Sequence, residues 1–312
     1  MAKKWSLACR TISITLRISS MNKLPMMALV AHDAGAANHI IYWLLAGDID
    51  LTYVRISFHG PALIAATNAG LEFDNLALDQ VLVGADFLVA GTGWATDIEK
   101  KAMRTAIFAS IPVAAVFDHW TNYDKRLYLD DEVIAVDEIW VTDTYAIELA
   151  RSFYPNADVC LKNNRYLDYQ VRNISSQICD PHKVLFLMEP IRALWAGEKD
   201  AGEFVAFHYF LENLSVLGIS GRIDIRIRPH PSDPIGKYAR LERSDDVINV
   251  TVNNDLPLHQ DIAAAAWVVG LQSYAMVVAL EAGKKVISAM PNHAPSCVLP
   301  HKGIIHIKEI TG

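Results

Sequence analysis

From Met27 onward, short apolar runs alternate along the chain with longer segments in which apolar residues recur at helical spacing. Such short runs are typical of buried strands, and the longer segments are typical of helices that cover a sheet. In the first half, the pattern predicts strands at 27–32, 51–57, 86–91, 111–119, 138–143 and 158–163. It predicts helices at 34–45, at 61–69, in the second part of 91–110, and from 144 to about 153. Strands separated regularly by helices favour βαβ units and a parallel sheet.

The alternation is lost between residues 164 and 182, where the sequence is polar, and then starts again. The second half predicts strands at 183–190, 222–230, 247–252, 267–270 and 284–291, and helices at 201–217, 258–266 and 273–283. The predicted fold class is therefore α/β, with two doubly wound, Rossmann-like domains at 26–165 and 183–312 joined by a linker at 166–182. In open α/β sheets, ligands bind beyond the carboxyl ends of the strands, so two facing domains predict a central cleft between those ends.

Composition agrees with a well-packed globular protein. The 312 residues are 52% hydrophobic and 20% charged. A formal net charge of −7 argues against general nucleic-acid binding. The sequence has no run of 18 apolar residues that would predict a transmembrane helix. The four cysteines lack metal-binding spacing, which favours reduced thiols in a cytoplasmic protein.

Residues 1–25 differ from the rest of the chain, because they carry five positive charges and no acidic residue. We expect a disordered basic extension before an internal start at Met21. The alternative is a basic segment that lies on an anionic membrane, which would give the protein a peripheral contact at the inner membrane face.

The strand predicted at 222–230 ends in the sequence RIRPHPSDP, which places His230 between two prolines. His230 shares the parity of Arg226 and Arg228, so the three side chains are predicted on one side of the strand. Pro231 disfavours the α conformation for His230 and keeps this position extended. An imidazole beside guanidinium groups suits an anion, most simply a phosphate. The alternative is a surface turn in which the prolines only end the strand.

A second candidate phosphate site follows the strand at 267–270. A short loop leads to Gln272 and Ser273, and Ser273 is suited to be the N-cap of an apolar helix. The free N–H groups and the positive dipole end of that helix would also favour an anion. Glu281 follows about two turns further along the helix. The alternative is an ordinary capped helix.

Polar residues also gather at strand ends in the first domain. His32 and Asp33 follow the first strand in the sequence VAHDAGAANHI, which lacks the complete glycine pattern of a dinucleotide site. Gly93 belongs to a similar loop after the strand at 86–91.

The densest polar group follows the fourth strand, in the sequence AVFDHWTNYDKR. Asp118, His119, Trp120 and Asn122 are residue types that suit a sugar or acceptor site, and an aspartate here could be a general base toward an acceptor hydroxyl. The alternative is a structural aspartate that caps a turn. No metal site is predicted, because the DID sequence at 48–50 precedes a strand instead of following one.

The two Rossmann-like halves, the RPHP strand end and the later sequence GLQSYAMVVALEAGKKVI resemble the GT-B glycosyltransferases. More narrowly, they resemble bacterial transferases that use CMP-activated ulosonic acids, such as sialyltransferases and Kdo transferases. Those families carry a His-Pro motif and a Ser-rich or Gln-x-Ser motif that contact the CMP phosphate. The matching positions are His230-Pro231 and Gln272-Ser273, and the Gln-Ser pairing favours the Kdo-type version.

The resemblance implies metal-independent transfer of a nonulosonic or Kdo-like acid from a CMP-linked donor to a glycan, glycolipid or glycoprotein acceptor, with no further cofactor. His230 would donate to the departing phosphate, and Asp118, or Asp33 as the second choice, would be the acid of the N-terminal domain that receives the acceptor's proton. The other implied contacts are Arg228, Gln272, Ser273 and Glu281 to the nucleotide, and Gly93, His119, Trp120 and Asn122 to the sugar or acceptor.

Three other functions stay open at this point. UDP-GlcNAc 2-epimerases and the glycerophosphotransferases of teichoic-acid synthesis share much of the same domain plan. A non-catalytic module that binds a nucleotide or sugar phosphate would also account for the two candidate phosphate sites.

Overall fold

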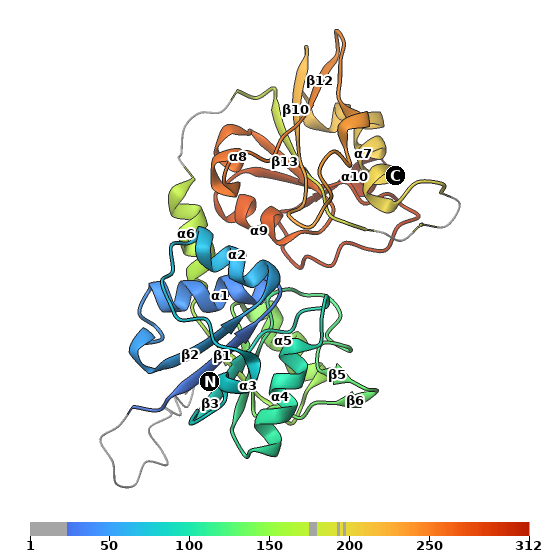
Figure 1. Ribbon diagram of the computed structural model, residues 1–312. Coiled ribbons are helices and arrows are strands. Elements are labelled where there is room, and N and C mark those ends of the chain that lie inside the picture. The colour runs from blue at the N-terminus through green and yellow to red at the C-terminus, as the bar shows by residue number, and fades with distance from the viewer. Residues whose placement is uncertain (1–23, 175–179, 192–193, 196–197, 312) are drawn as a thin grey trace, which may run out of the picture.

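The computed structural model describes residues 24–174, 180–191, 194–195 and 198–311. Residues 1–25 were predicted to be a disordered extension. Apart from residues 24 and 25, this segment lies outside the described residues. Two domains follow one another along the chain, and each has a central, mainly parallel sheet with helices on both faces (Figure 1). This arrangement confirms the predicted α/β class and the two Rossmann-like domains.

The sheet of the N-terminal domain has parallel strands in the order β2-β1-β3-β4-β7-β8. They are β1 (Met27–Ala31), β2 (Val54–Phe58), β3 (Phe87–Ala90), β4 (Val113–Val116), β7 (Glu138–Val141) and β8 (Asp158–Leu161). One face is covered by α1 (Ala34–Leu45) and α2 (Gly60–Asn68), and the other by α4 (Ile98–Phe108) and α5 (Thr144–Phe153). All positions of β3 and β4 are buried, as expected of strands covered on both faces.

The sheet of the C-terminal domain has the order β11-β12-β10-β9-β13-β14-β15. Its strands are β9 (Lys183–Leu187), β10 (Ile223–Arg228), β11 (Arg243–Ser244), β12 (Ile248–Val252), β13 (Trp267–Gly270), β14 (Lys285–Ser288) and β15 (Ile305–His306). One face is covered by α7 (Gly202–Glu212) and α10 (Ile307–Thr311), and the other by α8 (Leu258–Ala264) and α9 (Tyr274–Glu281). Without β11, which pairs antiparallel to β12, the strands follow the Rossmann order 3-2-1-4-5-6.

The connection between the domains begins with a helix. α6 (Arg165–Asn173), which the hydrophobic pattern did not indicate, occupies the first half of the segment predicted as the linker, 166–182. Asn164 caps α6 by accepting a hydrogen bond from the backbone N–H of Leu167. The helix packs on α1 of the N-terminal domain and on α8 and α9 of the C-terminal domain (Figure 1). The connection is therefore part of the contact between the domains.

The other differences from the prediction are short elements. Residues 51–53 form a 3-10 helix instead of the start of β2. Elements that the hydrophobic pattern did not indicate include β11, α10, α3 (Leu78–Val81), the β5–β6 hairpin (Tyr128–Leu129 and Glu132–Val133) and a 3-10 helix (Ala239–Leu241). Within the part of the chain that the structure describes, no helix is long and apolar enough to cross a membrane.

Candidate active site

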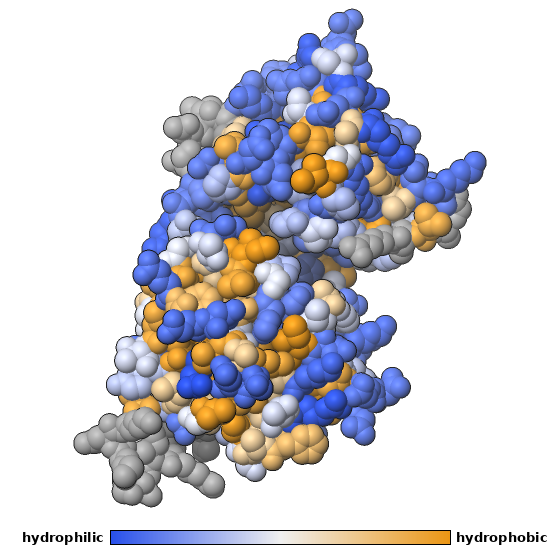
Figure 2. All heavy atoms as spheres, in the orientation of Figure 1, coloured by the Kyte–Doolittle hydropathy of each residue, from blue (hydrophilic) through white to orange (hydrophobic). Residues whose placement is uncertain are grey.

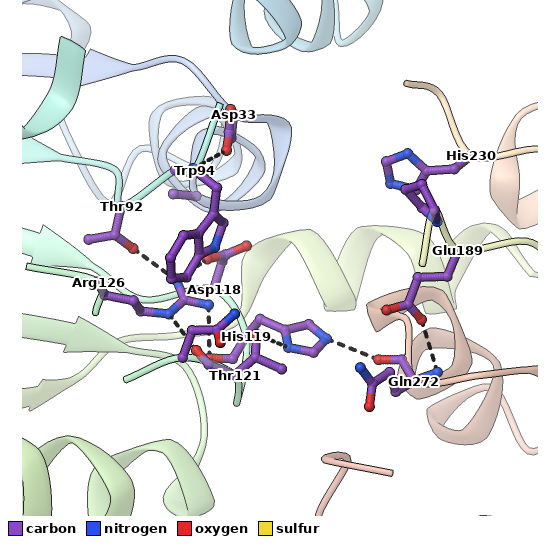
Figure 3. A pocket seen from close by; sticks show the side chains of 14 residues that line it. Asp33, Thr92, Trp94, Asp118, His119, Thr121, Arg126, Glu189, His230 and Gln272 are labelled. Atoms are coloured by element: carbon purple, nitrogen blue, oxygen red, sulfur yellow. Dashed lines mark hydrogen bonds and ion pairs between the residues drawn. The ribbon is translucent and has the colours of Figure 1, made fainter. Parts of the chain in front are cut away.

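A cavity of about 430 Å³ lies between the two domains. In the space-filling view, the surface is indented between the two lobes (Figure 2). The N-terminal domain contributes Asp33, Ala36, Thr92, Gly93, Trp94, Asp118, His119, Thr121, Asn122 and Arg126 to its walls, and the C-terminal domain contributes Glu189, Pro190, His230 and Gln272 (Figure 3). The predicted cleft between the carboxyl ends of the two sheets is therefore present.

The cavity adjoins the point in each sheet at which the strand order reverses. In the N-terminal sheet this point lies between β1, which is followed by Asp33, and β3, which is followed by Gly93. In the C-terminal sheet it lies between β9, which is followed by Glu189, and β13, which is followed by Gln272. Ligands of open α/β sheets bind at such switch points, so both domains direct their ligand-binding edge into one space.

His230 reaches this cavity from the loop after β10. Its Nδ1 accepts a hydrogen bond from the backbone N–H of Ser232 at 3.2 Å and lies 2.8 Å from Ser232 Oγ. Burial lowers the pKa of His230 below its ordinary value of 6.5, although the charge of Asp233 acts in the opposite direction. The ring is therefore neutral at neutral pH, and because Nδ1 accepts, the proton is on Nε2.

A network of charges fixes the loop that carries His230. Asp233 accepts hydrogen bonds from the backbone N–H of His230 at 3.1 Å and from the hydroxyl of Tyr238 at 2.8 Å. Lys237 Nζ lies 2.7 Å from Asp233 and 2.7 Å from the buried carboxylate of Glu203 on α7. Since Tyr238 and Glu203 are buried, the loop is attached to the core of its domain.

Asp118 follows β4 and lies across the cavity from His230 (Figure 3). Burial would raise the pKa of Asp118, but the charge of Arg126 and a 2.7 Å hydrogen bond from Arg126 Nη1 outweigh it and lower the pKa. Gly35, in the first turn of α1, permits the close approach of Asp118, because a Cβ atom there would collide with Oδ2. Asp118 is thus an ionised carboxylate held against the positive end of a helix dipole.

Arg126 holds together the loop that carries Asp118, and sequence reasoning did not identify it. Its buried guanidinium also donates to Thr92 Oγ1 at 2.9 Å and to the carbonyl oxygens of Thr121 at 3.0 Å and His119 at 3.2 Å. Charge-assisted hydrogen bonds to this many acceptors fix the loop firmly. The only indication in the sequence is that Arg126 ends the polar run after β4.

Asp33 binds the loop after β3. The backbone N–H of Trp94 donates to Asp33 Oδ2 at 2.7 Å, and Oδ1 lies 2.8 Å from His32 Nδ1. Behind this contact, the fully buried Glu99 accepts from the backbone N–H groups of His32 at 2.9 Å and Gly93 at 2.8 Å. Burial raises the pKa of Glu99 to about 7, although these two hydrogen bonds oppose the rise. Glu99, which sequence reasoning also missed, therefore ties together the loops after β1 and β3.

His119 and Gln272 join the two domains directly. His119 Nε2 lies 3.0 Å from the carbonyl oxygen of Gln272 and donates to it, while Nδ1 faces the hydroxyl of Thr121. Burial lowers the pKa of His119, so its ring is neutral. The backbone N–H of Gln272 donates to Glu189 Oε2 at 3.0 Å, and burial raises the pKa of Glu189 to about 7. Glu189 is a third residue of the site that sequence reasoning missed, since a single acid after β9 carries no recognisable pattern.

Trp120 does not line the cavity, so its position does not support the predicted contact to an acceptor. The indole is buried, and its Nε1 donates to Asp143 Oδ1 at 3.2 Å. The ring stacks on Tyr274 of α9 with a centroid separation of 6.1 Å and meets His301 edge-on at 4.9 Å. Trp120 is therefore part of the aromatic contact between the domains.

Arg228 is turned away from the predicted phosphate site. Arg228 Nη1 pairs with Asp261 on α8, and Arg226 Nε lies 3.1 Å from the other oxygen of the same carboxylate. The chain leaves the strand after Arg228, so the shared parity does not bring the arginines to the cavity with His230. The expected guanidinium neighbours of His230 are thus absent from the cavity wall, as far as the chain is described.

The two other predicted phosphate contacts on α9 differ in position. Ser273 precedes the helix but makes no capping hydrogen bond, and its Oγ is buried without a hydrogen-bond partner among the described residues. Glu281 is exposed at the opposite end of α9 and does not line the cavity, so its position does not support a contact to the ribose.

The predicted sugar-side residues Gly93 and Asn122 do line the cavity, and Asn122 adopts a left-handed conformation with φ 56°. Trp94, beside Gly93, was not predicted; it lines the cavity, and 48% of its surface is exposed. Among the described residues, no group of three or more His, Cys, Asp or Glu side chains is placed to hold a metal ion. The roles assigned to the site residues stay predictions.

Comparison with known proteins gives the fold. No family model and no curated protein matches this chain. The structure of UDP-GlcNAc 2-epimerase from Neisseria meningitidis bound to UDP-GlcNAc is similar, with a TM-score of 0.51 and 12% identity over 84% of this chain and 82% of that chain. The glycotransferase of kitacinnamycin is similar with a TM-score of 0.51 and 12% identity over 93% of this chain and 88% of that chain. At these identities the likeness shows the fold alone, and this chain has a GT-B-like fold.

Proposed function

We propose that this protein is a glycosyltransferase that moves a sugar from a nucleotide-linked donor to an acceptor. The observation that carries the proposal is the placement of His230 and Asp118 on opposite walls of one cavity, at the switch points of two Rossmann-like sheets. A transferase needs catalytic groups on opposite walls of its site, because the donor's leaving group and the acceptor's nucleophile must be held on either side of the transferred sugar.

The chemistry follows from the state of the two residues. Cleavage of the donor's glycosidic bond leaves negative charge on the nucleotide phosphate, and His230 Nε2–H would donate a hydrogen bond or proton to it. The buried hydroxyl of Ser273 and the amino end of α9 would hold other phosphate oxygens. Asp118, kept ionised by Arg126, would accept the proton of the acceptor hydroxyl.

For the donor, we favour a CMP-linked nonulosonic or Kdo-like acid, used without a metal ion, and for the acceptor a glycan or a glycosylated molecule. This choice is supported by the resemblance of the His230-Pro231 and Gln272-Ser273 motifs to those of CMP-dependent transferases. The second candidate is a sugar-nucleotide epimerase, which is favoured by the similarity in fold to an epimerase bound to UDP-GlcNAc. An epimerase would turn over its donor without any acceptor.

A thermal-shift screen with CMP, UDP, CDP and NAD would test the proposal. We expect CMP to raise the melting temperature, whereas a shift with UDP alone would favour the epimerase. In the variant His230→Ala, the turnover of a nucleotide sugar should fall about 10²–10³-fold, as is typical when one phosphate or oxyanion donor is removed. His208→Ala, at an exposed position of α7, is the matched control. Unchanged turnover in His230→Ala would exclude both enzyme candidates at this site.

A further inference from the structure

Glu189 places a carboxyl group where the proposed function requires a phosphate. It follows β9 at the switch point of the C-terminal sheet, and it lies between His230 and Gln272 on the cavity wall (Figure 3). A carboxylate is an unexpected neighbour for an anionic ligand, because like charges at short distance repel strongly in a partly buried site.

Within the part of the chain that the structure describes, no cation pairs with the carboxyl group of Glu189. The hydrogen bonds that Glu189 accepts come from Gln272. Arg126 is the only lysine or arginine among the described residues that line the cavity, and its guanidinium pairs with Asp118. An ionised Glu189 would thus meet a phosphate without a cation between them.

We propose that Glu189 binds the phosphate of the nucleotide ligand in its protonated form, as a hydrogen-bond donor, so that ligand binding takes up one proton. This inference rests on the proposed function, since it assumes that a nucleotide phosphate lies beside His230. It adds a specific consequence, which is that nucleotide affinity weakens as the pH rises through neutrality.

Glu189 is suited to titrate near neutral pH. The neighbouring histidines are neutral above pH 7 in the free protein, so its titration can be distinguished from theirs. Burial raises its pKa to about 7, so the free protein carries a mixture of both forms near neutral pH. Burial lowers the pKa of both His230 and His119, which are neutral above pH 7. The other titratable groups around Glu189 are Asp33, Asp118 and Arg126 of the cavity wall and the thiol of Cys297. Burial raises the pKa of that thiol above its ordinary value.

The experiment is isothermal titration calorimetry with UDP-GlcNAc and with CMP-sialic acid between about pH 6 and pH 8.5. The phosphodiester groups of these probes keep their charge over this range, so a pH effect comes from the protein. We expect the affinity to fall by up to tenfold per pH unit above pH 7, and the binding heat to depend on the ionisation enthalpy of the buffer, with a proton uptake that approaches one at the upper end of the range. In Glu189→Gln, the affinity should be independent of pH, and Glu212→Gln on α7 should behave like the wild type.

The outcomes separate this inference from the proposed function. Binding that is equally strong at both ends of the pH range, without proton uptake, would overturn the inference and leave the function standing. Affinity that increases with pH and is lost at every pH in Glu189→Gln would show that the carboxylate binds ligand hydroxyls instead. If neither probe binds at any pH, the proposed function fails and this inference fails with it. The calorimetric proton count needs only the wild-type protein, so an absence of proton uptake would overturn the inference even if the variant folds poorly.

Discussion

The two walls of the cavity are built differently. On the N-terminal wall, Arg126 bonds to Asp118 and to three other acceptors, and Glu99, behind the wall, bonds to two backbone N–H groups. On the C-terminal wall, the carboxyl group of Glu189 has only Gln272 as a hydrogen-bond partner among the described residues. Ser273 does not line the cavity but follows Gln272, which does, and its buried hydroxyl has no partner in the same part of the chain.

The difference indicates what each wall does. Groups whose bonds are complete are preorganised, and they do not have to rearrange when charge develops nearby. Groups whose bonds are incomplete have capacity left for a ligand, and burial without a partner is a cost that a ligand can remove. Changes on the N-terminal wall should therefore reduce stability first, and changes on the C-terminal wall should reduce binding first.

The largest effect is expected for Arg126→Met. This change leaves the Asp118 carboxylate partly buried without its cation, and removing one partner of a buried ion pair typically costs about 3–5 kcal/mol. Chemical denaturation would measure the loss in the free energy of unfolding. The control is Arg104→Met, which breaks an exposed ion pair with Asp130 and should cost about 0–1 kcal/mol. Equal effects of the two changes would mean that Arg126 does not organise the wall.

A second effect, which depends on pH, is expected for Glu99→Gln. The pKa of Glu99 is raised from 4.5 to about 7, so the stability that its protonated form contributes is present below pH 4.5 and is lost as the pH rises to about 7. At about 1.4 kcal/mol per pKa unit, the loss amounts to about 3 kcal/mol. Glutamine does not titrate, so the substitution should cost more at pH 5 than at pH 8.

Melting temperatures of Glu99→Gln and the wild type, compared at both pH values, would measure this difference. Glu148→Gln, at an exposed position of α5, should show no such dependence. A cost of Glu99→Gln that stays constant with pH would contradict the assignment of a raised pKa to Glu99.

The sequence could predict those site residues whose position depends on local constraints, and not those whose position depends on distant partners. Strand ends with local constraints were predicted well: the prolines beside His230 and the polar run that contains Asp118 identified residues that do meet in one cavity. The position of Arg228 does not support the predicted phosphate contact, because the residue pairs with Asp261 on α8, and no local pattern reveals that pairing.

Glu99, Arg126 and Glu189 were missed for the same reason. The importance of each comes from burial and from partners that only the folded chain brings together. The helix α6 was a different kind of error, because its signal was present. Asn164 is a good N-cap residue, and Tyr166, Leu167 and Gln170 lie on neighbouring positions of one helix face, but the polar composition of the segment favoured a linker.

A smaller effect is expected for Asp233→Asn. The carboxylate of Asp233 accepts hydrogen bonds from the N–H of His230, the hydroxyl of Tyr238 and the ammonium group of Lys237. The NH₂ group of an asparagine side chain would place a donor against one of these three donors. Lys237 keeps Glu203, so we expect a loss of about 1–3 kcal/mol in the free energy of unfolding. Nucleotide affinity should fall as well, because the loop that aims His230 is loosened. Asp246→Asn, at an exposed position, is the control for both measurements.

The smallest effect on stability, and the sharpest distinction between the walls, is expected for Ser273→Ala. The hydroxyl is buried without a partner among the described residues, so its removal should not lower the free energy of unfolding, and relief of the desolvation cost should raise it by up to about 1 kcal/mol. Nucleotide affinity, measured by calorimetry, should still fall about tenfold or more if the hydroxyl binds phosphate, because a hydrogen bond to a charged group contributes about 1.5 kcal/mol or more. Ser288→Ala offers the opposite case: its hydroxyl donates to Leu271 O at 2.8 Å, so the change should cost about 1 kcal/mol of stability and leave affinity unaltered. If Ser273→Ala lowered stability and not affinity, the C-terminal wall would be as complete without a ligand as the N-terminal wall is.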